Sequence, residues 1–435
     1  MPKHILIILI ACITTSLEAQ EFPEFARRAI ENNYGIRIFR NLETIASNNN
    51  TAGNAGMLPS VSADGNFARS INNTRQQFFI TDDRVGTNAQ TDNFNARLTA
   101  NWTLFSGFRI QATRDQLGYL EELGGSDTRF LIEQTLSDLA GVYFQLTAET
   151  SVLRNLRATL DVSLARLTLE QSRKTIGAGT ALSYNQALSD YQSDSAAVLA
   201  EEALITTLAI RLNTIASNTT DRSYILPDEI SYPGFTGSLE QVNATLASAS
   251  EELKAAQLNE LLAETQRSIA DSRMYPEVNA FGGYAFSRVT NEVGFLKSSR
   301  NYGPEFGLSV RFNLFNGGTV QTARENADIN AANAKLNSEL ILAQLKSSAA
   351  IHFELLTSLD QRIRLAEQTA DVAQENLSIG RAQLAQGVIS GIDFRAIQLE
   401  TVRAQNAVVA LKQAHCTSVI QLLRLSGQLT QTFLR

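Results

Sequence analysis

The sequence repeats its own plan, and this duplication is the strongest constraint on its fold. Residues 57–63 (MLPSVSA) match residues 274–280 (MYPEVNA) at Met, Pro, Val and Ala, and residues 98–114 match residues 308–324. A third match pairs two sets of three residues, namely Arg173, Gly179 and Asn185 with Arg381, Gly387 and Asp393. One such match could arise by chance, but three in the same order indicate an internal duplication.

Each repeat contains two stretches in which apolar and polar residues alternate. The clearest are residues 94–104 and 306–314, and weaker alternation occupies residues 61–70 and 278–287. Alternation with a period of two predicts strands that have one apolar and one polar face. A strand of about 9 to 11 residues can cross a bilayer at a tilt. We therefore expect four strands in two hairpins that cross a membrane or, alternatively, cover a soluble core.

Long tracts without proline predict helices. Residues 109–175 and 319–385 each suit one continuous helix, about 100 Å long at about 1.5 Å per residue. Shorter helices are expected at residues 24–49, 182–217, 239–272 and 392–432. From Leu342 to Leu384, apolar residues recur at alternating spacings of three and four, which is typical of a coiled-coil seam. The predicted fold is therefore mainly helical, with long coiled-coil hairpins and four strands in each chain.

The predicted organisation has three parts. Residues 1–19 have the basic start, short apolar region and small-residue end of a secretory signal peptide. An alternative reading takes Cys12 as the lipid-bearing residue of a lipoprotein, and either reading predicts export. The two repeats follow, each with a strand hairpin and a helix-hairpin tip: residues 20–230 with strands in 61–105 and a tip at 176–183, and residues 231–435 with strands in 277–315 and a tip at 386–392.

Composition excludes several classes of protein. With 44% apolar and 19% charged residues the chain can fill a core, and it contains no run of eighteen apolar residues. A net charge of -7 offers no basic surface for nucleic acid. His352 and His415 belong to no metal-spaced cluster, and no phosphate-binding or nucleophile-elbow motif is present. We therefore predict no enzyme activity, no metal or other cofactor and no nucleic-acid partner.

This duplicated order of helix, strand hairpin, long helix, tight turn and returning helix resembles the outer membrane factor family, which is typified by the TolC exit duct. The most similar segments are the strand entries at residues 56–61 and 274–278, the strand exits at residues 104–107 and 314–318, and the glycine turns. The early segment 29–33 (AIENN) also looks like the first helix of the family. The resemblance covers essentially all of the chain after residue 19.

Four strands cannot close into a barrel, and unpaired edge groups in lipid cost several kcal/mol each. Copies of the chain must therefore share one barrel if the strands cross a membrane. Two copies would give an eight-stranded barrel filled by side chains, whereas three would give twelve strands and room for a lumen. The resemblance implies the homotrimer in outer membrane lipid, with a helical tunnel that extends into the periplasm. The polar strand faces would place four residues in the lumen: Arg97, Asn101, Arg311 and Asn313.

The resemblance also assigns roles to the two tips, which would receive a periplasmic adaptor and narrow the closed tunnel. The adaptor-docking residues would be the turn glycines Gly177, Gly179, Gly387 and Gly391. The gate would involve Asn185, Asp393, Arg381 and Arg395. The family has a basic residue two positions after the second tip glycine, where this chain has Ile389, so Arg381 or Arg395 would have to substitute for it. Asp393 near a helix start could instead be an N-terminal cap.

The function implied by the resemblance is a passive outer membrane exit duct. It would serve a tripartite efflux or type I secretion system, in which the adaptor joins it to an inner-membrane pump or secretion ATPase. The alternative is an exported structural coiled-coil protein without a conducting lumen. The sequence names neither the cargo nor the pump.

Overall fold

The structure is a computed structural model that describes residues 22–217, 235 and 237–434. The predicted signal peptide, the Cys12 alternative and the boundary between the repeats at 230 and 231 lie outside the described residues. The chain divides into two compact units. We call them the helical unit (Met1–Phe39, Thr128–Glu251, Leu342–Arg435) and the sheet unit (Arg40–Asp127, Glu252–Ile341).

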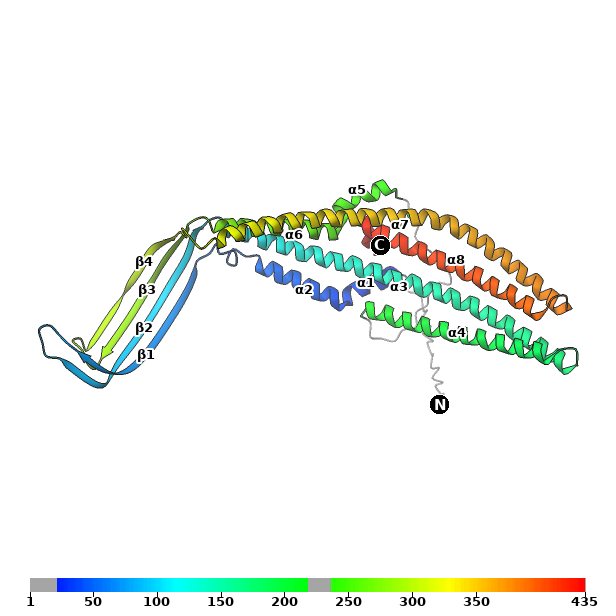
Figure 1. The fold of residues 1–435 in the computed structure, drawn as a ribbon, viewed down its shortest axis with the longest axis horizontal. Coiled ribbons are helices and arrows are strands. Elements are labelled where there is room, and N and C mark those ends of the chain that lie inside the picture. Colours follow the sequence, from blue (N-terminus) through cyan, green and yellow to red (C-terminus); the bar gives the residue numbers. More distant parts are fainter. Residues whose placement is uncertain (1–21, 218–234, 236, 435) are drawn as a thin grey trace, which may run out of the picture. The chain divides into compact units, whose positions relative to one another are not determined.

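The sheet unit contains four antiparallel strands in the order β1-β2-β3-β4, drawn side by side in Figure 1. They are β1 (Ser60–Gln76), β2 (Arg84–Ser106), β3 (Glu277–Asn291) and β4 (Ser298–Arg311). The register places apolar residues opposite one another, as in the pairs Phe67–Phe94 and Ala280–Leu308. These residues share one face because directly opposed residues in a pleated sheet point to the same side. The four predicted strands are therefore present, with apolar residues gathered on one face.

The strand ends differ from those predicted. β1, β2 and β3 continue through polar residues that the alternation had left in loops, because backbone pairing does not require apolar side chains. β4 likewise begins earlier than predicted, at Ser298, but it ends at Arg311, so residues 312–314 lie beyond the strand in which they were predicted. Gly317 and Gly318 follow with φ angles of 68° and 83°, and the chain enters the next helix there.

The helices match the predicted lengths closely. The two long ones are α3 (Arg109–Thr175) and α7 (Thr319–Gln386), and their returning partners are α4 (Ala181–Ile215) and α8 (Gly391–Leu425). Each remaining predicted helix is broken once. The pieces are α1 (Phe22–Asn32) and α2 (Tyr34–Asn49), α5 (Leu239–Ala249) and α6 (Glu251–Ser272), and the short α9 (Leu429–Phe433) after α8.

Local hydrogen bonding accounts for these breaks. The Asn33 side chain accepts a hydrogen bond from Ile36 N and so caps α2. Ser250 is extended between α5 and α6, and Gly427, with φ at 68°, ends α8 before α9. No helix in the described part of the chain is long and apolar enough to cross a membrane.

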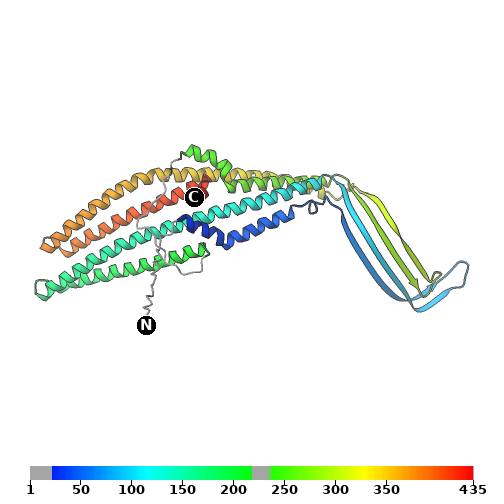
Figure 2. The same ribbon diagram turned by 180° about the vertical axis from the view of Figure 1, so that it is seen from behind.

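The core of the helical unit lies where α1, α3, α4 and α8 pack together. Leu136 and Leu139 of α3, Leu212 of α4 and Leu422 of α8 are fully buried there. Phe22 adds edge contacts with Phe433, at 4.8 Å between ring centroids. The helix hairpins extend from this core, and Figures 1 and 2 draw α8 alongside α7.

Candidate functional site

The two helix-hairpin tips adopt the same turn. Gly177 and Gly387 follow α3 and α7 with φ angles of 75° and 76°, which favour glycine because a Cβ would be strained there. In each turn the next residue donates back to the last helical turn, from Ala178 N to Arg173 O and from Val388 N to Gln383 O, both at 2.9 Å. Each long helix therefore ends in a glycine C-cap.

This geometry corrects the alignment of the two tips. Matching identical residue types paired Gly179 with Gly387, but the shared conformation pairs Gly177 with Gly387. Gly179 does not have a positive φ. Its hydrogen atom instead allows close approach to the preceding helix, where a Cβ would lie 3.0 Å from Lys174 N. The structural counterpart of Asp393 is consequently Ser183 rather than Asn185.

The helices that leave the tips start with side-chain caps. Thr180 accepts a hydrogen bond from Ser183 N at 3.1 Å, and Ser390 accepts one from Asp393 N at 3.2 Å. The Asp393 carboxylate in turn accepts from Ser390 N and Oγ, which completes a capping box. Asp393 therefore has the capping role that the sequence left open.

A buried polar cluster lies between the two hairpins, near their tips. We call it the tip cluster; its members are Ser163 and Arg166 of α3, Asp190 and Asp194 of α4, and Arg395 and Gln398 of α8. Arg395 binds Asp194 through two nitrogens, both at 2.7 Å. Arg166 donates to Asp190 at 2.6 Å, and Asp190 lies 3.6 Å from Arg395. The cluster thus connects α8 to both α3 and α4.

The tip cluster is shielded from water. The side chains of Arg166, Asp194 and Arg395 are only 3%, 11% and 14% exposed. Burial lowers the pKa of the Arg395 guanidinium, but hydrogen bonding and charge attraction from Asp194, together with Asp190, more than offset this and raise it overall. Two arginines and two aspartates balance in charge, which is the condition under which buried ions are tolerated.

A second link joins α3 to the end of α7. Arg173 donates to the carbonyl oxygens of Leu384 and Ala385, at 3.0 and 3.4 Å. These carbonyls end α7, so the guanidinium supplies partners and positive charge where a helix terminus needs both.

Arg381 and Asn185, two of the predicted gate residues, are exposed on helix surfaces.

Sequence reasoning identified Arg395 but missed its partners. Asp190 and Asp194 are spaced by four residues, which places both on one face of α4. That spacing was a usable signal for a paired acidic site. Nothing in a single sequence states that α4 faces α8, so the pairing itself needed the fold.

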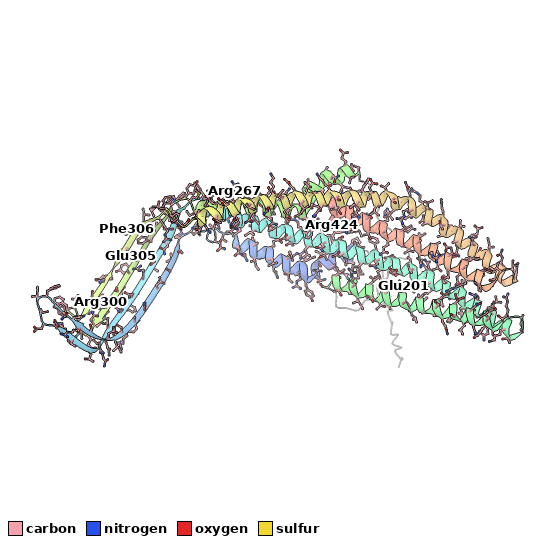
Figure 3. All side chains as sticks on the ribbon, in the orientation of Figure 1. Glu201, Arg267, Arg300, Glu305, Phe306 and Arg424 are labelled. Carbon is pink, nitrogen blue, oxygen red and sulfur yellow. The ribbon has the colours of Figure 1, made fainter. Side chains whose placement is uncertain are left out.

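The predicted lumen residues lie in the sheet unit. Arg97 forms an ion pair with Glu305 at 3.2 Å, and Arg311 stands opposite Glu277 in the register. Asn101 is paired with Ser60 in β2 and β1, whereas Asn313 lies past the end of β4. Glu305 and Phe306, labelled in Figure 3, are consecutive and therefore lie on opposite faces of β4.

The described residues contain no group of three or more His, Cys, Asp or Glu side chains that could hold a metal ion. His415 is buried, and its Nε2 lies 3.2 Å from Asp360 Oδ1. Burial lowers the pKa of both His415 and His352. His415 is therefore a packed core histidine, whereas His352 is half-buried.

Comparison with known proteins gives a family match for part of the chain. Residues 244–428 match the family model described as outer membrane efflux protein. This segment of the chain is similar to the outer membrane efflux protein family. This confirms the resemblance seen in the sequence. The matched segment therefore resembles a transport protein of the outer membrane.

Solved structures confirm the predicted fold. CusC matches with a TM-score of 0.76 and 16% identity over 94% of this chain and 92% of CusC. VceC from Vibrio cholerae matches with a TM-score of 0.75 and 16% identity over 93% of this chain and 96% of VceC. The open state of the Neisseria gonorrhoeae MtrE outer membrane channel matches with a TM-score of 0.73 and 14% identity over 94% of this chain and 89% of MtrE. No curated protein sequence matches the chain.

Proposed function

We propose that three copies of the chain form one passive exit duct, in which each copy supplies four strands of a shared twelve-stranded barrel. The observation that carries this proposal is the open sheet, in which β1 and β4 each pair with a neighbouring strand on one side only within the described chain. Its apolar residues are exposed, with Phe67 at 61%, Leu98 at 52% and Phe306 at 85%. Lipid would cover such a face, and a neighbouring copy would satisfy each edge.

We further propose that the helix-hairpin tips form the gate and the docking site for a periplasmic adaptor. Gly177, Gly179, Gly387 and Gly391 lie in or beside the tip turns, where an adaptor can reach them. The tip cluster supports the gating role, since it is a charge-paired link between hairpins that would have to separate or rotate for the duct to widen. The energy for transport would come from an inner-membrane pump or secretion ATPase.

Single-channel recording in planar bilayers tests the duct. The full-length protein should produce reproducible openings of uniform conductance, because a shared barrel encloses a continuous aqueous path. Folded protein that inserts but never conducts would instead support the alternative, an exported structural coiled-coil protein without a lumen. Heat-sensitive migration of the assembled form on gels provides the control that the preparation is folded.

A further inference from the structure

A basic cavity lies in the sheet unit, where the strands meet the helices. Its volume is about 450 Å³, within the range of small-ligand sites. Most of its lining residues are polar or charged, and they include Arg109, Arg273, Arg311, Glu277, Asn313 and Asn316. Three guanidinium groups face one carboxylate, so the lining carries an excess of positive charge. Buried Ser106 and Ser272 complete the polar wall.

Among the described residues, two of these arginines form no ion pair. Arg109 lies 3.5 Å from Glu277, which is the only carboxylate lining the cavity. Within the described part of the chain, no ion pair engages Arg273 or Arg311. The nearby Asp271 is already held by Arg324 at 2.6 Å. Such a group of unpaired guanidinium ions, with amide donors beside them, suits an oxyanion.

The strand register places the cavity on the polar face of the sheet. Ser106, Glu277 and Arg311 stand at the same level on β2, β3 and β4. Their neighbours Val278 and Val310 are paired on the opposite, apolar face. A ligand in the cavity is therefore approached from the aqueous side of the sheet rather than from lipid.

The internal duplication indicates that this charge is not needed to join strand to helix. In the first repeat the positions equivalent to Arg273, Glu277 and Arg311 are Gly56, Ser60 and Asn101, which are uncharged. Both repeats nevertheless enter the long helix through two residues with positive φ, which are Gly107 and Phe108 in the first repeat and Gly317 and Gly318 in the second. The second repeat thus carries three ionisable groups that the fold shared by the two repeats does not require.

The wall of the cavity is also rigidly placed. Gly107, with φ at 62°, brings the end of β2 so close to the end of α6 that a Cβ there would lie 2.4 Å from Ser272 O. Phe108 packs edge-on against Tyr275, with ring centroids 6.0 Å apart. These contacts hold the segments that carry Arg109, Arg273 and Glu277 against one another.

We propose that this cavity is a binding site for a phosphate or carboxylate group on a passing solute, so that the duct favours anionic cargo. This proposal rests on the proposed function, because the solute would reach the cavity from the lumen of the duct. In the trimer, three such sites would surround the duct at the inner end of the barrel. Arg273 and Arg311 would hold the anion, and Asn313 and Asn316 would donate to it.

Binding of inorganic phosphate to the full-length protein in detergent tests the site without requiring conduction. Arg273→Gln combined with Arg311→Gln should weaken phosphate binding, measured by equilibrium dialysis, by about tenfold or more. Glu277→Gln should tighten it. The matched control is Arg288→Gln with Arg300→Gln, which removes the same charge from paired positions at the other end of β3 and β4 and should leave binding within about twofold. Equal binding by the wild type and the cavity variant would overturn the proposal.

Reversal potentials in a salt gradient then connect the site to transport. The cavity variant should shift the permeability ratio away from anions, while the control pair should not. A conducting channel with unchanged selectivity would contradict the inference and leave the duct intact. If the protein does not conduct, the proposed duct function fails. The phosphate-binding measurement then tests by itself whether the cavity is an anion site. Intact mass spectra test whether the cavity opens to water or to lipid. A phospholipid retained by the wild type but not by the cavity variant would overturn the proposal that the cavity opens to the aqueous side of the sheet.

Discussion

At the scale of single residues, Arg395 is the side chain on which the link between the hairpins most depends. It joins α8 to Asp194 and Asp190 of α4, and Gln398 beside it donates to Ser163 and Thr159 O of α3. Removing one member of a buried ion pair leaves the other without compensation, which typically costs about 3 to 5 kcal/mol. The tip cluster therefore combines a structural role with the proposed gating role.

Arg395→Gln should loosen the tips. We expect a lower midpoint of thermal denaturation, a local loss of about 3 kcal/mol in the helical unit and a higher open probability in single-channel records. Arg381→Gln is the matched control, because this exposed arginine lies on the same hairpin and its loss should change stability by less than about 0.5 kcal/mol. If both variants behave like the wild type in both measurements, the tip cluster is not a latch.

Glu201 of α4, labelled in Figure 3, should make stability depend on pH. Burial and the neighbouring Glu149 of α3 raise its pKa from 4.5 to about 7. A raised pKa means that the fold favours the protonated acid. The contribution of Glu201 to stability is therefore complete below about pH 4.5 and is lost as the pH rises through about 7.

Glu201→Gln should imitate the protonated acid. Its thermal midpoint should exceed that of the wild type at pH 8, and the two midpoints should converge at pH 4.5. Glu202→Gln is the control, since that neighbour instead pairs with Arg157 at 2.7 Å on an exposed surface. A wild-type advantage at pH 8 would contradict the assignment.

At the scale of elements, the helices were predictable and the strand ends were not. The proline-free tracts gave α3 without error and α7 to within one residue, because helix length follows from local sequence. The ends of β1 and β2 depend on pairing between strands, which polar residues such as those of the segment 84–93 sustain without any apolar signal. The tip glycines were located correctly, but their equivalence required the φ angles of Gly177 and Gly387.

Gly387→Pro tests the tip as an element. Proline fixes φ near about −65°, whereas the turn holds Gly387 at 76°, so the C-cap of α7 cannot form. We expect faster proteolytic cleavage at residues 386–391 and impaired cargo resistance in cells, with normal insertion of the barrel. Gly65→Ala in β1 is the control, because no atom lies within 4 Å of a Cβ there and its φ is ordinary. Unchanged resistance with a disrupted tip would argue against the docking role.

At the scale of the whole molecule, the shared barrel depends on edge strands that meet between copies. Phe67→Cys on β1, combined with single cysteines at even positions from 302 to 310 on β4, should give disulfides between chains in at least one combination. The native Cys416 should not interfere, because burial raises its thiol pKa to about 12. Cysteines placed on the inner strands β2 and β3 should not cross-link. Cross-linking from those strands alone would contradict the shared barrel.

The mass of the intact particle is the sharpest test of whether three chains share one barrel. The native protein extracted in mild detergent should weigh three chains once bound detergent is subtracted, and it should aggregate when the detergent is removed. A folded single chain that stays soluble without detergent would contradict the account, because its sheet would then need neither lipid nor neighbours.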